Sequence, residues 1–396
     1  MKLIIFIAFI FIIWFVFVIT RKLIYSIAWL LLISIINFSS IFGVDVDVFI
    51  KFLFLLTYIL LAFTNKINIK MLIPFFSIFI LFFINLCNAK YGNGYNFYSG
   101  FSAVISIIIG FISLIIIYNE NQKYFLLKLL SALPVISIII GIILWPLGLC
   151  NPFQRGNYFA LAGVSASTNL AFYSVIGIVT SLYVFYTKNL NKYRFIAYLN
   201  FFILCGTLTR GGILAGFIII IYDLFHLVKK MLKTKNGIAQ LFVITIFLFF
   251  PFFIIIKQLE ARTFVDGELN TSGRIDAWEY IISLCENKFI GNGYGFLKTR
   301  TDYELKSFTA AHNEYIHLYL ETGMIGVIIF FTIVLGIFIY HIRNGNNNKI
   351  KILYCAFLIG FLVYSIVDNT ISNYHFFIPF MLLLSLFNIN LKKKEV

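Results

Sequence analysis

Residues 315–340 read YIHLYLETGMIGVIIFFTIVLGIFIY, a run that is apolar apart from a few polar side chains. An α-helix needs about 20 such residues to cross the about 30 Å of hydrocarbon in a bilayer, and this run exceeds that length. A transmembrane β-strand would need only about 10 residues of alternating character. The run therefore predicts a membrane-spanning α-helix.

Runs of the same kind occur from one end of the chain to the other. Hydrophobic residues make up 61% of the sequence, whereas soluble domains contain about 45–50%. A helix satisfies its own backbone hydrogen bonds in lipid. We therefore predict an all-α polytopic membrane helix bundle with about 12–13 transmembrane helices, because one of the runs, 195–208, is short. The candidate runs are 3–19, 23–42, 48–63, 71–87, 101–118, 125–149, 161–186, 195–208, 211–228, 238–256, 315–340, 352–367 and 376–389.

One long polar stretch, 257–311, interrupts the series of apolar runs. No other stretch is long enough for a separate domain, so we predict a single integral membrane domain over residues 1–396 with 257–311 as a loop within it. The first apolar run imitates a secretory signal. Thr20, Arg21 and Lys22 offer no small-residue cleavage site and another run follows at once, so we expect this run to remain as a helix.

The formal net charge of +15 invites a nucleic-acid-binding interpretation, but the positions of the basic residues argue against it. Nineteen of the 31 lysines and arginines fall in seven alternate short segments between or after the apolar runs. Short loops rich in these residues stay on the cytoplasmic side of a membrane. The sequence thus predicts a membrane protein with no nucleic-acid partner, a cytoplasmic carboxyl terminus and the 257–311 loop on the outer side. Thirteen spans would place the amino terminus outside.

The five cysteines are isolated from one another along the chain, so we expect neither a disulfide framework nor a zinc site. The motifs H-E-x-x-H and G-x-S-x-G do not occur, which leaves metalloprotease and serine hydrolase interpretations without support. We expect no metal and no cofactor. Chemistry should then be sought among polar side chains at the outer edge of the membrane, where ionisable groups are costly to keep.

Arg210 is the first candidate, because it lies in a tight hairpin between two apolar runs. Residues 205–212 read CGTLTRGG, and so short a turn keeps Arg210 near the membrane boundary. The glycines allow helices to approach closely, while the planar guanidinium suits a phosphate. The alternative is an arginine that merely extends its charge from a helix end into water, and the motif alone favours neither.

Arg274, in the long loop, is the second candidate. Residues 271–278 read TSGRIDAW, and apolar residues then recur at helical spacing, which predicts an interfacial helix. Thr271 or Ser272 can cap its amino end, where free amides and the helix dipole favour an anion. The alternative is a solvated arginine. The segment GNGYG at 291–295 lacks a flanking strand and crossover helix, so we predict a surface turn rather than a nucleotide loop.

His312 is the third candidate. Its spacing to Ile316, Tyr319 and Gly323 predicts that the four share one helical face, with His312 in the first turn at the outer end. An imidazole can change protonation near neutral pH and can accept a proton from a hydroxyl nucleophile. A lone histidine at an interface is more often structural. His317 points to a different side of the helix and is the one for which we predict a structural role.

Other polar residues carry weaker signals. Arg155, in NPFQRGN at 151–157, is predicted outside, where it could add a phosphate or sugar contact. Asp368, Asn369 and His375 flank an outer turn and could support a site there. Asp223 lies beside lysines at the cytoplasmic end of its helix and is interpreted as part of a charged boundary.

Together these residues resemble the O-antigen ligase and polymerase superfamily of bacterial envelope enzymes. The histidine signature of that superfamily is matched by His312 and Asn313, followed after nine residues by Gly323 and then by Gly326. The segment TLTRG at 207–211 resembles the family's Ser-Arg-Gly hairpin, with threonine where serine is usual. Segments 272–278 and 287–293 resemble its outer-loop segments, although Lys-Phe replaces the commoner Asn-Pro or Asp-Pro ahead of the glycine turn. The resemblance spans 205–340.

The resemblance implies metal-independent glycosyl transfer on the periplasmic face of the bacterial inner membrane, with 257–311 as a long periplasmic loop. The donor would be a glycan on undecaprenyl diphosphate, and the acceptor a hydroxyl of lipid A-core or of another glycan. Arg210 and Arg274 would bind the diphosphate, and His312 would orient or deprotonate the attacking hydroxyl. The supporting residues would be Arg155, Asn313 and Tyr319.

Three alternatives remain open at the level of sequence. An O-antigen or capsular polysaccharide polymerase would use the same donor and motif, and an enzyme that transfers glycan to protein would share them too. A lipid-linked sugar transporter is the alternative of another class, and it would place ionisable groups near the bilayer midplane on broken helices. The candidates here gather at the outer edge, which favours the enzyme.

Overall fold

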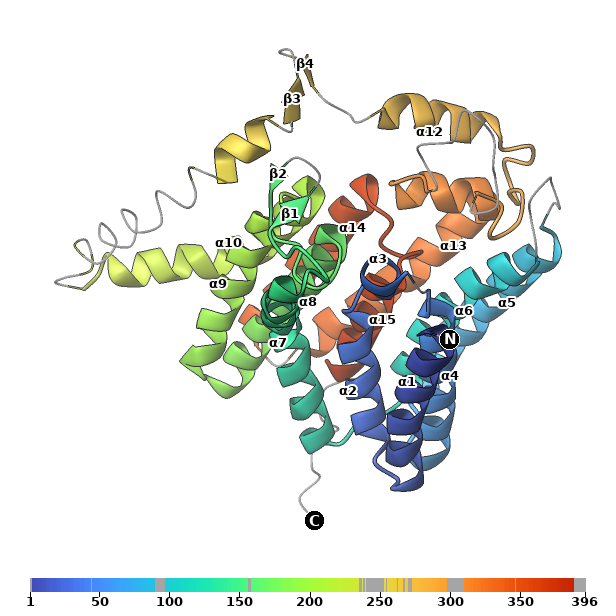
Figure 1. The fold of residues 1–396 in the computed structure, drawn as a ribbon, viewed down its shortest axis with the longest axis horizontal. Helices are drawn as coiled ribbons and strands as arrows, with labels where there is room; N and C mark the ends of the chain where they lie inside the picture. Colours follow the sequence, from blue (N-terminus) through green and yellow to red (C-terminus); the bar gives the residue numbers. More distant parts are fainter. Residues whose placement is uncertain are drawn as a thin grey trace.

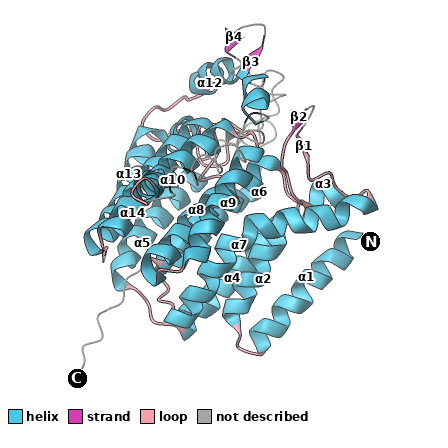
Figure 2. Ribbon diagram, turned by 90° about the vertical axis from the view of Figure 1, so that its left-hand side faces the viewer, coloured by secondary structure: helices cyan, strands magenta, loops and turns pink. Residues whose placement is uncertain are grey.

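The structure, a computed structural model, describes residues 2–43, 45–89, 97–155, 158–234, 237, 239, 253, 255–261, 263–265, 268–269, 273–297, 310–345 and 347–387. Within them the chain folds as a bundle of helices (Figures 1 and 2). Seven helices there are long and apolar enough to cross a membrane, and four shorter apolar helices accompany them. The chain is therefore an all-α polytopic membrane helix bundle, as predicted.

The helices follow the predicted runs closely in most places. Their bounds are α1 (Lys2–Ile19), α2 (Leu23–Ser34), α3 (Phe38–Phe42), α4 (Asp47–Thr64), α5 (Leu72–Cys87), α6 (Phe97–Ile115), α7 (Glu120–Leu144), α8 (Ser167–Lys188), α9 (Asn191–Gly206), α10 (Arg210–Met231), α12 (Arg274–Ser283), α13 (Glu314–Asn344), α14 (Asn348–Val367) and α15 (Tyr374–Leu386). Short 3-10 turns at Ile69–Met71 and Trp145–Leu147 adjoin α5 and α7. Two small antiparallel hairpins pair β1 (Gln154–Arg155) with β2 (Tyr158–Phe159), and β3 (Phe264–Val265) with β4 (Glu268–Leu269).

Two predicted runs differ from the structure, and one lies mostly outside the described residues. The run 23–42 is divided into α2 and α3, because the Asn37 side chain accepts a hydrogen bond from the Ser40 backbone and starts a new helix. The run 161–186 becomes helical only at Ser167. The run 238–256 is described at 239, 253 and 255–256 alone.

Helix α8 occupies the centre of the bundle. It contacts α7, α9, α10, α14 and α15, and most of its side chains are buried. A helix that is apolar on all sides is expected in such a position. Large side chains of α1 and α5, including Ile4, Ile73 and Phe76, are instead more than half exposed on the outside of the bundle. In a bilayer those side chains face lipid.

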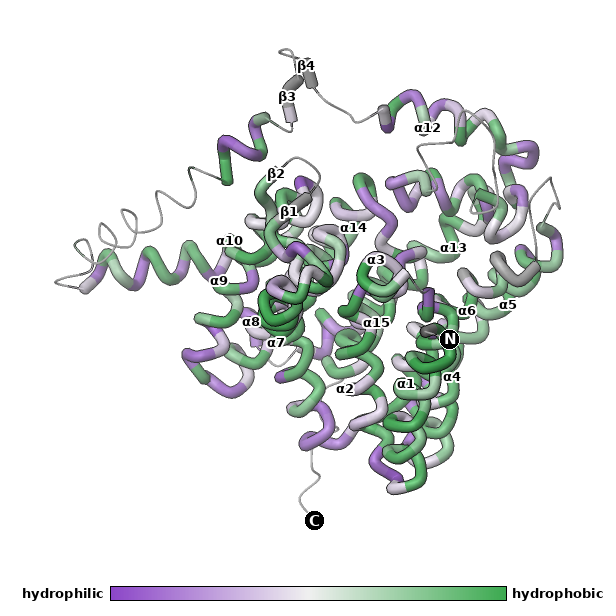
Figure 3. Tube along the Cα trace, viewed as in Figure 1, coloured by the Kyte–Doolittle hydropathy of each residue, from purple (hydrophilic) through white to green (hydrophobic). Residues whose placement is uncertain are grey.

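The polar loops gather at the two ends of the bundle (Figure 3). Segments predicted to share the cytoplasmic side, at 21–22, 64–65 and 121–122, line one cavity of about 730 Å³. Segments predicted to share the outer side, at 45–47 and 369–373, line another, together with residues 36–39 from the end of a predicted run. Figures 1 and 2 place α12 and the hairpins at the end opposite the turn between α1 and α2. This arrangement agrees with the predicted alternation of the loops.

Asp223 is not part of an exposed charged boundary, as the sequence suggested. Its side chain is only 3% exposed and accepts hydrogen bonds from Arg194 Nε (2.7 Å), Tyr198 Oη (2.6 Å) and Tyr186 Oη (2.9 Å). A buried carboxylate is tolerated when it is paired and fully hydrogen-bonded. The cluster ties α10 to α8 and α9 at the end of the bundle away from the candidate site.

Candidate active site

The start of α13 differs from its prediction and fixes the position of His312. The helix begins at Glu314, because the Asn313 side chain accepts hydrogen bonds from the backbones of Tyr315 (3.0 Å) and Ile316 (3.2 Å) and so caps it. His312 therefore lies outside the helix, and the prediction that it occupies the first turn on one face with Ile316 is wrong. Its φ of +48° places it in the left-handed region, which non-glycine residues adopt uncommonly.

His312 faces a carboxylate that arrives from a distant part of the chain. Its Nδ1 lies 3.5 Å from Oδ1 of Asp368, the residue that follows α14. The His312 side chain is 35% exposed and that of Asp368 is 10% exposed. A carboxylate beside Nδ1 favours the tautomer with its proton on that nitrogen, which leaves Nε2 as the acceptor of the ring. The distance is at the long end of the hydrogen-bond range, as is common for catalytic contacts before substrate binds.

Arg274 stands at the first position of α12 and reaches the same end of α14. Its guanidinium donates to the Val367 carbonyl oxygen at 2.6 Å. Burial lowers the pKa of Arg274, and the nearby charge of Arg210 lowers it further, whereas the Asp368 carboxylate raises it. Two guanidinium groups are thus held close enough to repel each other in a half-buried setting. A bound anion would relieve that repulsion.

Arg210 reaches this place through close packing of α10 on α14. A side chain on Gly211 would put its Cβ 2.1 Å from a Val367 methyl group, so only glycine permits the approach. The glycines of residues 205–212 were expected to bring α9 and α10 together, and Gly212 does approach Leu204 of α9. Gly211 has the different role of bringing the start of α10 against the end of α14, where Arg274 binds Val367.

Helix α12 also contacts the segment just before His312. The Trp278 indole donates to the Ala311 carbonyl oxygen at 2.7 Å, so one helix contacts both Val367 and Ala311. This confirms the predicted helix after residue 273, while the predicted capping residues Thr271 and Ser272 lie outside the described residues. Figure 1 shows α12 above α13, away from the centre of the bundle.

The supporting residues that the sequence suggested have separate positions. Asn313 caps α13 next to His312. Tyr319 packs in a second small core with Ile281 of α12 and Leu297, rather than beside the arginines. Arg155 lies in β1, where the structure describes its backbone but not its side chain.

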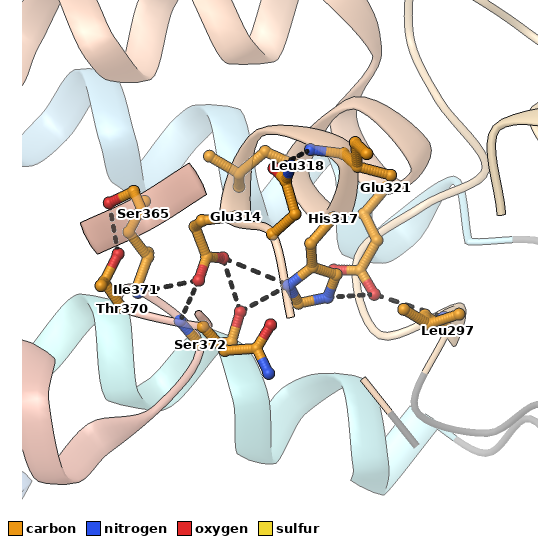
Figure 4. Close-up of polar contacts among 12 residues, drawn as sticks. Leu297, Glu314, His317, Leu318, Glu321, Ser365, Thr370, Ile371 and Ser372 are labelled. Carbon is orange, nitrogen blue, oxygen red and sulfur yellow. Dashed lines mark hydrogen bonds and ion pairs between the residues drawn. The ribbon is translucent and has the colours of Figure 1, made fainter. Parts of the chain in front are cut away.

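His317, for which we predicted a structural role, lies in a buried network on α13 (Figure 4). Its Nδ1 is 3.2 Å from Glu314 Oε1, and its Nε2 is 3.1 Å from Glu321 Oε1. Both glutamates are 0% exposed. An imidazole can donate to a carboxylate at each ring nitrogen only as the imidazolium, so the network places one positive charge between two carboxylates. The spacings i, i+3 and i+4 are a sequence signal for such a network, and the predicted structural role of His317 did not include it.

Glu314 also holds the turn that carries Asp368. Its Oε2 accepts hydrogen bonds from the backbones of Ile371 (2.9 Å) and Ser372 (3.2 Å), and Oε1 accepts one from the Ser372 hydroxyl at 2.7 Å. Hydrogen bonds to a charged group in a buried place are strong. The turn between α14 and α15 is thereby fixed against the start of α13, and Asp368 is fixed beside His312.

Helix α13 is broken at Gly323. This residue has φ +66° and ψ −177°, a conformation that essentially only glycine adopts. A Cβ on it would lie 2.2 Å from the Phe289 backbone. Beyond the break, the Met324 amide donates to the Lys288 carbonyl at 2.9 Å and the Ile325 amide to the Phe289 carbonyl at 3.2 Å. Gly323 is thus needed for a close backbone crossing as well as for its dihedral angles.

The segment GNGYG is not the surface turn that we predicted. Residues 291–297 are all buried, and they pack against the break in α13. The Asn292 amide donates to the Leu320 carbonyl at 2.8 Å, and the Gly293 amide donates to the Glu321 carbonyl at 2.9 Å. The broken helix leaves those carbonyls without helical partners, and this segment supplies them.

Replacing Gly323 with alanine should lower stability by about 2–4 kcal/mol, because it combines left-handed strain with overpacking against Phe289. The measurement is thermal unfolding of the purified protein in detergent. Gly336→Ala is the matched control on the same helix, since a Cβ there meets nothing within 4 Å. Equal melting temperatures for the two variants would contradict the account of the break.

Comparison with known protein families gives a match over the region of the candidate site. Residues 195–331 match the family model described as O-antigen ligase. The match covers about a third of the chain, and over that region the chain is similar to O-antigen ligases. The matched O-antigen ligase region runs from α9 into α13, and it includes Arg210, Arg274 and His312. No curated protein matches the chain.

The match to this family model implies a glycosyltransferase-like enzyme of the O-antigen ligase or polymerase type. Its substrates are then a lipid-linked glycan and an acceptor, and the seven long apolar helices make it a multi-pass membrane protein. Asp368 lies beyond the matched region, yet it contacts the histidine within it. Among the residues that the structure describes, no group of three or more His, Cys, Asp and Glu side chains is arranged to hold a metal ion.

Proposed function

We propose that this protein is an O-antigen ligase that transfers a glycan from undecaprenyl diphosphate to a hydroxyl of lipid A-core. The reaction would take place on the periplasmic face of the bacterial inner membrane. The observation that carries the proposal is the meeting of two arginines with a histidine–carboxylate pair at the end of α14. Arg210, Arg274 and His312 come from three separate parts of the chain, and Val367 and Asp368 connect them.

The two arginines suit the diphosphate of the donor. A guanidinium can form two parallel hydrogen bonds to phosphate oxygens, and charge-assisted bonds of this kind are about twice as strong as neutral ones. As the glycosidic bond to the diphosphate breaks, negative charge grows on the leaving oxygen. Arg210 and Arg274 would offset that charge most strongly in the transition state, which is where binding accelerates a reaction.

His312 suits the acceptor hydroxyl. The hydroxyl oxygen forms a bond to the anomeric carbon of the donor sugar, the bond from that carbon to the diphosphate oxygen breaks, and undecaprenyl diphosphate departs. The hydroxyl proton passes to Nε2 of His312. Asp368 beside Nδ1 then stabilises the imidazolium and keeps the ring oriented, the role a carboxylate has in other histidine-based sites.

One observation also suits the transporter alternative. Helix α13 is broken at Gly323, close to the buried residues His317 and Glu321, and broken helices with ionisable groups occur in secondary transporters. Transport needs two compartments, whereas group transfer does not. Activity of the purified protein in detergent therefore distinguishes the two functions.

The test incubates the purified protein in detergent with an undecaprenyl-diphosphate-linked glycan, lipid A-core and a chelator of divalent cations. We expect glycan on lipid A-core, detected by a shift in gel mobility and in mass. Transfer only to a second lipid-linked glycan would make the protein a polymerase and would contradict the ligase assignment. Absence of transfer to either acceptor, with a folded protein, would contradict the proposed function.

A further inference from the structure

A polar cavity of about 530 Å³ adjoins the site on the side away from the arginines. The loop between α2 and α4 forms one wall, and the start of α13 with the turn between α14 and α15 forms the other. Among the described residues that line it are Asn37, Asp47, Asn169, Glu321 and Asn373. The volume lies within the about 300–1,000 Å³ that is typical of small-molecule sites.

Glu321, whose carboxylate is buried, is one of the residues that line this cavity. Its Oε1 accepts from both His317 Nε2 (3.1 Å) and the Leu297 amide (3.3 Å). Its Oε2 has no hydrogen-bond partner among the residues that the structure describes, although the side chain is 0% exposed. A buried charged acceptor without a donor is costly. A ligand hydroxyl in the cavity would supply the donor.

The charges around the cavity disfavour an anion. Asp45, Asp47 and Glu321 line it together with Lys51 and the His317 imidazolium, so carboxylates outnumber these cations by three to two among the described residues. The Lys51 ammonium lies 4.9 Å from the centre of the Tyr374 ring, whose hydroxyl donates to Asp47 at 2.8 Å. A wall rich in carboxylate and amide acceptors suits a neutral molecule with many hydroxyl groups, and it is unsuited to the diphosphate that the arginines attract.

The cavity lies next to His312. Ala310 and Asn369 line it, and Asn369 follows Asp368 directly, with its amide donating to the Asp368 carboxylate at 2.9 Å. Ala310 precedes His312 by two residues, so their Cα atoms lie within about 7.6 Å of each other. The helices that carry the arginines, α10 and α12, contribute no described lining residue. A hydroxyl held here would approach the anomeric carbon from a side different from that of the diphosphate.

We propose that this cavity binds the acceptor sugar whose hydroxyl attacks the donor, an inference that rests on the proposed function. Glu321 Oε2 accepts a hydrogen bond from a sugar hydroxyl, and the asparagine side chains of the walls bind others. The reacting hydroxyl projects from the cavity toward His312. The donor glycan is the other source of sugar hydroxyls at this site, and separate KM values for donor and acceptor distinguish the two.

The first test places a bulky side chain at the exposed edge of the cavity. Ser39 and Ser40 are adjacent exposed residues of α3, and only Ser39 lines the cavity. Ser39→Trp should raise the KM for lipid A-core about 10-fold or more and leave the KM for the lipid-linked donor within about 2-fold, since a bulky ring would occupy the acceptor's space. Ser40→Trp is the matched control, and both of its KM values should stay within about 2-fold of the wild type.

A second variant tests the buried carboxylate. Glu321→Gln keeps the size of the side chain but removes the charged acceptor, so the KM for lipid A-core should rise about 10- to 100-fold. A melting temperature measured in detergent shows whether this variant folds. If it does not, the two exposed serine variants decide the question.

The outcomes separate failure of this inference from failure of the proposed function. If the wild type transfers glycan and the KM for lipid A-core is the same in Ser39→Trp and Ser40→Trp, the cavity assignment is wrong. The ligase assignment is then unaffected. A rise in donor KM alone would assign the cavity to the donor glycan and would overturn the inference.

If the wild type transfers nothing, equilibrium binding of deacylated lipid A-core oligosaccharide still tests the cavity. Binding that Ser39→Trp abolishes would support a sugar site, and equal binding by both serine variants would contradict it.

Discussion

His312→Asn is expected to lower the rate of glycan transfer by about 10²- to 10⁴-fold, the range that general acid–base catalysis contributes. Asparagine is chosen because it tolerates the left-handed backbone that His312 adopts, whereas alanine would add strain. The asparagine amide cannot accept the hydroxyl proton at neutral pH. The fold should therefore persist while the chemistry is lost. Initial rates of transfer to lipid A-core, in detergent and at saturating substrates, provide the measurement.

The control for this variant is an exposed histidine far from the site. His226 lies near the opposite end of α10, and its Nδ1 is 3.0 Å from the Tyr222 carbonyl oxygen. His226→Asn should leave the rate within about 2-fold of the wild type, as surface substitutions usually do. Asp368→Asn should give an intermediate loss, because the imidazole remains but loses its carboxylate. A His312→Asn enzyme with the wild-type rate would remove His312 from the mechanism.

Arg274→Ala is expected to cost about 10²- to 10³-fold in kcat, comparable with the loss of a preorganised donor to an oxyanion. The half-buried guanidinium donates to Val367 and lies within electrostatic reach of Arg210. Its removal would leave the developing charge of the leaving diphosphate with one arginine. If Arg274 acts mainly in the transition state, kcat should fall much more than the KM for the donor rises. Steady-state kinetics with varied lipid-linked donor measure both constants.

Two further variants show whether position or mere charge matters at Arg274. Arg274→Lys retains the charge but loses the planar fork, so it should recover only part of the rate. Glu279→Ala changes an exposed residue of the same helix and should leave kcat within about 2-fold. Full activity in Arg274→Ala, or an equal loss in Glu279→Ala, would contradict a role in binding the diphosphate.

The sequence predicted the helices well because the thickness of a bilayer sets their length. Breaks within the runs were harder to predict. Asn37 starts a new helix by capping it, and the same chemistry at Asn313 moves His312 out of α13. Both caps are local signals that the sequence contains, and the helical spacing of the apolar residues obscured them. The spacing of Gly323 suggested a continuous helical face, whereas its left-handed break depends on the backbone of Phe289 and could not be derived from periodicity.

The candidate site was predicted in part. Arg210, Arg274 and His312 stand in segments that resemble a known family, and the structure brings those segments to one end of α14. The partners of these residues were not predicted, because they come from far along the chain. Asp368 is 56 residues from His312, and Ser372 is 58 residues from Glu314, so only the fold brings them together. The network around His317 includes a distant contact, with Ser372, and local contacts, with Glu314 and Glu321.

The break in α13 separates two parts of one helix that have different neighbours. The part after Gly323 packs on α5 and α14 through Phe330 and Phe338, whereas the part before it is bound to the turn after α14, and the 287–293 segment contacts both sides of the break. A change in bilayer thickness or helix tilt acts on the longer, lipid-embedded part. The break at Gly323 transmits little of that motion, because the carbonyls of Leu320 and Glu321 bind the 287–293 segment instead of the next turn of the helix. We therefore expect tilting of the lipid-embedded part to displace His312 less than it would if α13 were unbroken.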